Sequence, residues 1–137
     1  MSSNPIVFRY SEYKGITIPL IPIKLMDSDN QWHEFWVYVD SGATYSILKA
    51  QEAKRLGIDL EAGKLEGISV GDGSSIPVYF HKLTFKLGDH EFKARIGFSH
   101  KLGIGFNVLG RKDIFDRFVV CFDDQKKQLI LHPNKNI

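Results

Sequence analysis

The chain has 137 residues, enough for a single domain that buries an apolar core, and its one cysteine, Cys121, excludes an internal disulfide framework. Its 18 basic and 16 acidic side chains give a formal net charge of +2, which is too small to predict binding to nucleic acid. Because no apolar stretch follows a basic start and no run reaches membrane-spanning length, we expect a cytoplasmic protein without a membrane partner.

Short apolar segments separated by turn signals predict a mostly β fold. In chain order, strands are expected over residues 6–10, 16–23, 32–39, two segments within 67–80, 83–87, 90–98, 106–109, 118–122 and 128–131. Pro19 and Pro22 cannot donate to a strand ladder, so the second of these strands is expected to be an edge strand or an irregular one. Good helix formers over residues 49–56, followed by Gly57, predict one short helix, and residues 112–117 predict one or two helical turns.

The strand expected over residues 32–39 runs directly into Asp40. Its last five residues are bulky and apolar, a composition that suits burial on both faces. A charged carboxylate at the end of such a strand costs on the order of several kcal/mol unless it is paired, hydrogen-bonded or used. Asp40 is therefore either a turn aspartate that caps local backbone amides or a reactive group. Ser41 adds a hydroxyl, and Gly42 lets backbone amides approach closely.

A second candidate segment is the hairpin whose tip carries Gly71, Asp72 and Gly73. Residues 67–71 match the Gly-x-Ser-x-Gly motif of serine hydrolases, but that motif needs a strand, a turn and a helix, and here a further strand follows. The five histidines show no metal-binding spacing. We therefore expect neither a metal nor another cofactor.

Two motifs resemble those of a known family. Asp40-Ser41-Gly42-Ala43-Thr44, after its apolar lead-in, resembles the active-site loop of aspartic proteases, and the single short copy is most similar to the retropepsin-like branch. Val108-Leu109-Gly110-Arg111, with the helical turns expected after it, resembles the second motif of that branch. The resemblance implies a small closed β-barrel in one domain over residues 1–137. It also implies one short helix after the catalytic loop and one near the C-terminal part, with the second motif passing beneath that loop.

The resemblance implies a homodimeric aspartic endopeptidase that cleaves peptides or unfolded proteins. Asp72-Gly73-Ser74 lacks an apolar lead-in strand, so the second catalytic aspartate would be Asp40 of another copy. Two such carboxylates would share one proton and activate a water molecule. Ser41 to Thr44 would support the loop, and Ser69-Val70-Gly71-Asp72-Gly73-Ser74 would form a flap that closes on substrate.

The chain departs from the retroviral pattern at two positions. Thr44 stands where those enzymes usually carry a second aspartate, the partner of the arginine that Arg111 matches. Asp72 makes the flap tip more polar than theirs. Two alternatives stay open: a catalytically idle domain of the same fold that serves in dimerisation or peptide binding, and a monomer that dimerises only with substrate.

Overall fold

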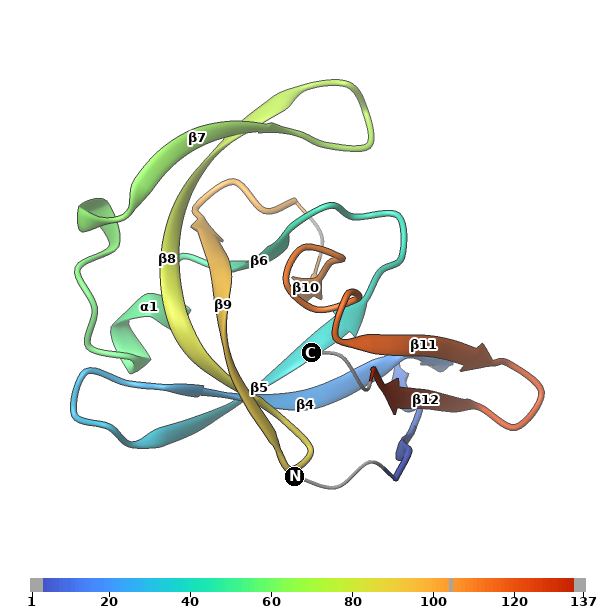
Figure 1. Ribbon diagram of the computed structural model, residues 1–137. Helices are drawn as coiled ribbons and strands as arrows, with labels where there is room; N and C mark the ends of the chain where they lie inside the picture. The colour runs from blue at the N-terminus through green and yellow to red at the C-terminus, as the bar shows by residue number, and fades with distance from the viewer. Residues whose placement is uncertain (1–3, 104, 135–137) are drawn as a thin grey trace.

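The computed structural model describes residues 4–103 and 105–134, and the predicted mostly β fold is confirmed over them (Figure 1). The strands are β1 (Ile6–Arg9), β2 (Ser11–Tyr13), β3 (Ile16–Ile18), β4 (Leu20–Met26), β5 (Trp32–Val39), β6 (Ser46–Lys49), β7 (Lys64–Ser69), β8 (Ser75–Leu87), β9 (His90–Ser99), β10 (Asn107–Leu109), β11 (Phe118–Asp123) and β12 (Gln128–Pro133). The helical segments are α1 (Glu52–Arg55) and the short 3-10 helix η1 (Leu60–Ala62).

Seven strands form the largest sheet, in the order β4-β5-β10-β6-β9-β8-β7. Two of its pairings are parallel, β10 with β5 and β6 with β9. Strand β8, next to last in this order, also pairs with β4, the first strand, at Lys24↔Lys86 and Leu25↔Phe85. Strands β1, β12 and β11 form a separate sheet, and β2 and β3 form a hairpin. The parallel pairing sets β10 beside the end of β5, and the antiparallel pairing of β10 with β6, at Val108↔Ile47, sets β6 next to it.

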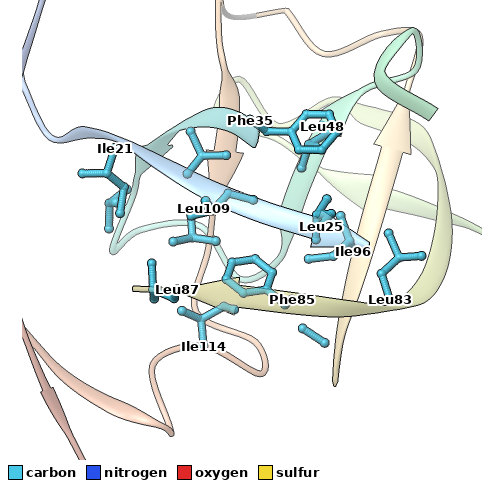
Figure 2. Close-up of a cluster of buried hydrophobic side chains, with 14 of the residues drawn as sticks. Ile21, Leu25, Phe35, Leu48, Leu83, Phe85, Leu87, Ile96, Leu109 and Ile114 are labelled. Carbon is cyan, nitrogen blue, oxygen red and sulfur yellow. The ribbon is translucent and has the colours of Figure 1, made fainter. Parts of the chain in front are cut away.

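The expected burial of residues 35–39 on both faces is wrong, because strand β5 alternates between buried and outward-facing side chains. Phe35, Val37 and Val39 are buried, whereas Trp36 faces outward. The buried side chains enter the main core, where aliphatic and aromatic residues from several strands meet (Figure 2). This core therefore fixes the strand that delivers Asp40.

A second, smaller apolar cluster lies apart from the main core. Its buried members come from β6 and β8, and partly buried side chains pack against it. The buried members are Ile47, Ile76, Val78 and Phe80, and the partly buried ones are Tyr45, Ile68, Val70 and Leu102. This cluster supports the hairpin of β7 and β8, which curves over the rest of the molecule (Figure 1).

Two helix predictions differ from the structure. The helix expected over residues 49–56 is present but shorter, because residues 46–49 are taken by β6, which pairs with β9. The second helix, expected over residues 112–117, is wrong, since this segment forms consecutive turns. Asp113 has a φ of 67° there, a left-handed conformation that a right-handed helix cannot contain.

The strand expected over residues 16–23 is divided at Pro19 into β3 and β4. Pro22 lies inside β4 and pairs with Trp36 of β5. The other edge of β4 pairs with β8 only at Lys24 and Leu25. On that edge no strand of the described residues lies opposite Pro22, so its missing N–H breaks no ladder hydrogen bond there. The predicted irregularity is confirmed.

Candidate active site

Asp40 is held at the point where β5 leaves its parallel neighbour β10. Its backbone N–H donates to the carbonyl of Leu109 at 3.0 Å, which extends the pairing of Leu109 with Val39 by one residue. The half-buried carboxylate accepts a hydrogen bond at Oδ1 from the N–H of Gly42, at 2.9 Å. Among the described residues no other donor reaches this carboxylate, so its second oxygen is available to an incoming group.

The loop after Asp40 is tied down through its carbonyl groups. The N–H groups of Arg111 and Lys112 donate to the carbonyls of Ala43 and Thr44, at 3.0 and 2.8 Å. The guanidinium of Arg111 donates to the carbonyl of Ser41 at 3.1 Å. The partner of Arg111 is thus a backbone carbonyl, and no carboxylate at position 44 is needed to hold it.

Gly110 lies where the two motifs cross. A Cβ atom at this position would stand 2.3 Å from the carbonyl oxygen of Tyr45 and 2.9 Å from that of Ala43. The Gly110 N–H donates to the hydroxyl of Ser46, which is fully buried, at 3.0 Å. Because the obstructing atoms belong to the backbone, this crossing requires glycine.

The structure adds two residues that the sequence interpretation did not single out. Ser46 supplies the buried acceptor for Gly110, and Tyr45 supplies the carbonyl that covers it. The signal for Ser46 was a lone polar residue before the apolar pair Ile47 and Leu48 at the start of a buried strand. Buried hydroxyls in such positions usually have a hydrogen-bond partner.

The predicted flap is a hairpin, with Ser69 of β7 paired to Ser75 of β8. Its turn is closed by hydrogen bonds between Val70 and Ser74, and between Gly73 and Val70, both at 2.9 Å. Gly73 has a φ of 85°, which favours glycine. Residues 71–75 are exposed, and the tip lies on the same side of the view as the loop after β5 (Figure 1).

The tip of this hairpin carries a fixed negative charge. Asp72 accepts hydrogen bonds at Oδ1 from the hydroxyl of Ser74 at 2.5 Å and from the Ser74 N–H at 2.8 Å. The Ser74 hydroxyl, and then its N–H, lower the pKa of the Asp72 carboxyl below its ordinary value. The tip is therefore anionic over the mildly acidic to neutral range.

The structure thus brings the Asp40 loop and the second motif into direct contact. Between the described residues, no hydrogen bond or ion pair joins residues 69–74 to Asp40. Within the same described ranges, no group of three or more His, Cys, Asp or Glu side chains is placed to hold a metal ion. None of the described helices has the length and apolar character needed to cross a membrane.

The family model and the solved structures that match this chain point to the same family. Residues 22–96 match the family model described as aspartyl protease. The fold is similar to EIAV protease complexed with the inhibitor HBY-793, with a TM-score of 0.55 and 23% identity over 77% of this chain and 92% of that one. It is also similar to a retropepsin-like aspartic protease from Rickettsia conorii, with a TM-score of 0.65 and 24% identity over 93% and 89% of the two chains. A comparison with curated proteins gives no match.

Proposed function

The chain belongs to the aspartyl protease family and has the retropepsin-like fold, and on that premise we propose that it is a homodimeric endopeptidase with Asp40 of each copy in one shared site. The observation that carries the proposal is the set of hydrogen bonds that holds Asp40 and its loop in place. A half-buried carboxylate with one oxygen in use stands on a loop that Arg111 and Lys112 hold through three carbonyl groups. Such rigidity suits a group that must meet its partner in a defined geometry.

The chemistry follows from the repulsion between two nearby carboxylates. Two Asp40 side chains facing each other cannot both ionise cheaply, so the pair holds one proton and titrates as a unit. The ionised member accepts a proton from water as that water attacks the peptide carbonyl. The protonated member donates to the carbonyl oxygen and then assists the departing amine.

The remaining residues have supporting roles in this proposal. Ser41 to Thr44 shape the loop, and Val108 to Arg111 support it from below. The hairpin residues 69–74 form the flap that closes over the substrate and excludes water. The pairing of β4 with β8 supports a small closed barrel as the frame for these parts.

The proposal is tested by cleavage of an unfolded protein by the parent chain and by Asp40→Asn, from mildly acidic to neutral pH. Loss of the shared carboxylate should lower the rate by roughly 10²–10⁴-fold, the usual contribution of acid–base catalysis. Asp89→Asn is the matched control, since Asp89 is an exposed aspartate in another turn. The solution mass of every variant should be that of a dimer. A dimer that cleaves nothing, in either form, would mean that the domain binds or dimerises without catalysis.

A further inference from the structure

The Arg95 side chain lies between the proposed flap and the segment that leaves the Asp40 loop. Arg95 is on β9, and its guanidinium donates to the carboxylate of Glu66 on β7. The same guanidinium lies 4.2 Å from the ring centre of Phe80 on β8 and 5.6 Å from that of Tyr45. One cation therefore contacts both strands of the hairpin and a residue next to the active-site loop.

The two aromatic partners also contact each other. The rings of Tyr45 and Phe80 have their centres 5.1 Å apart, and both belong to the small cluster beneath the hairpin. The Tyr45 backbone in turn covers Gly110, where the two motifs cross. Phe80 is paired with Gly97 of β9, so it keeps its place beside Arg95 and Tyr45 when the outer part of the hairpin moves. Glu66 lies opposite Val78, beyond the last pair of β8 with β9, so it belongs to the part of the hairpin that can move.

Arg95 itself is anchored on the opposite side. Its N–H donates to the carboxylate of Asp113 at 2.9 Å, so its backbone is tied to the turns that follow the second motif. The ion pair with Glu66 is about a third exposed at each side chain, and such a pair alone contributes little. Stacking on two rings orients the planar guanidinium, which a lysine ammonium cannot reproduce.

We propose that Arg95 is a positioning residue that couples the flap to the active-site loop, an inference that rests on the proposed function. Opening of the hairpin moves Glu66 away from the guanidinium, which then loses its fixed orientation on the rings of Phe80 and Tyr45. Closure restores the three contacts together. The order of the Asp40 loop thus depends on the position of the flap.

Hydrogen exchange of the substrate-free protein tests the coupling without any assay of activity. In Arg95→Met, amides of residues 64–80 and amides of residues 41–46 should both exchange roughly tenfold faster, the effect of losing an interaction of this strength. Lys93→Met is the matched control, because Lys93 is an exposed cation two positions away on the same strand. Faster exchange in the hairpin alone, or in neither segment, would overturn the proposal.

One further variant and one further assay separate coupling from simple loss of fold. Arg95→Lys keeps the charge but loses the stacking, and it should accelerate exchange in both segments to a smaller extent; it decides the question if Arg95→Met unfolds. In peptide cleavage, Arg95→Met should raise KM and lower kcat, while Lys93→Met changes neither. A change in KM alone would contradict coupling to the loop. If the parent cleaves no peptide, the proposed function fails, but the exchange measurement still decides the role of Arg95.

Discussion

Gly110 shows how a single missing side chain sets the distance between the two motifs. The atoms that a Cβ would meet belong to the backbone of Tyr45 and Ala43, so no rotamer change can relieve the contact. Gly110→Ala should lower the free energy of unfolding by about 1–3 kcal/mol, the usual cost of overpacking. Urea denaturation measures this loss.

Gly103→Ala is the control for that measurement, since a Cβ at Gly103 meets nothing within 4 Å. It should leave stability nearly unchanged. Equal effects of the two substitutions would show that the motifs do not cross as closely as described.

The hydrogen bonds of the Asp27 carboxylate predict that the stability of the protein depends on pH. Its carboxylate accepts hydrogen bonds from the N–H groups of Gln31 and Asp29 and contacts His33 Nε2 at 2.7 Å. The Gln31 N–H first, and then His33, lower the pKa of the Asp27 carboxyl below its ordinary value of 3.8. A lowered folded-state pKa stabilises the protein above the unfolded-state pKa, and this contribution is lost as pH falls through the folded-state value.

The parent chain should therefore be more stable than Asp27→Asn near neutral pH, and the difference should shrink once the pH falls below the ordinary carboxyl pKa. Urea denaturation of both chains across this pH range provides the test. A difference that stays constant down to the lowest pH would mean that the charge of Asp27 is not what stabilises the turn.

Residues differ in how far their roles could be predicted from the sequence. Asp40 and Gly110 each belong to a short sequence motif. The second motif was expected to pass beneath the Asp40 loop, and Gly110 does lie against the backbone of that loop. Arg111 could be located, but its partner Ser41 is 70 positions away and is set by folding alone. Arg95 carries no local signal, because Glu66, Phe80 and Tyr45 reach it from three other segments.

At the scale of elements, the segment after the second motif shows where local propensity fails. Residues 111–117 have a composition compatible with a helix, but Asp113 takes a φ of 67° and its carboxylate accepts the N–H of Arg95. A contact with β9 thus replaces a helical turn. Sequence periodicity over so few residues cannot detect such a contact.

Asp113→Ala should lower the free energy of unfolding by about 1–3 kcal/mol, because the half-buried Arg95 N–H loses its acceptor. Asp113→Asn should cost less, since asparagine keeps an acceptor oxygen and tolerates a positive φ. Thermal or urea denaturation ranks the two variants. Equal losses would show that the hydrogen bond to Arg95 contributes nothing to stability.

At the scale of the whole molecule, most strands were predictable and their order was not. Strands β2 and β6 were not predicted, and β8 is one continuous strand where two were expected. Alternating apolar residues mark β9 and an unbroken apolar run marks β5 from the sequence alone, but the parallel neighbours β10 and β5 are separated by several intervening strands. Strand alternation predicts which side chains face inward, not which strand lies alongside. The resemblance of the two motifs to one family, and not the strand periodicity, was the basis for expecting the second motif beside the Asp40 loop.

The central claim is that one Asp40 becomes catalytic only beside a second one, and mixing parent chains with Asp40→Asn chains tests it most directly. The two are unfolded together, refolded at varied ratios, and assayed for cleavage at constant total concentration. If both carboxylates are needed, activity follows the square of the parent fraction and falls to about a quarter in an equal mixture, as random pairing in a two-fold dimer requires. Activity that falls in direct proportion to the parent fraction would contradict the account, because each chain would then act alone.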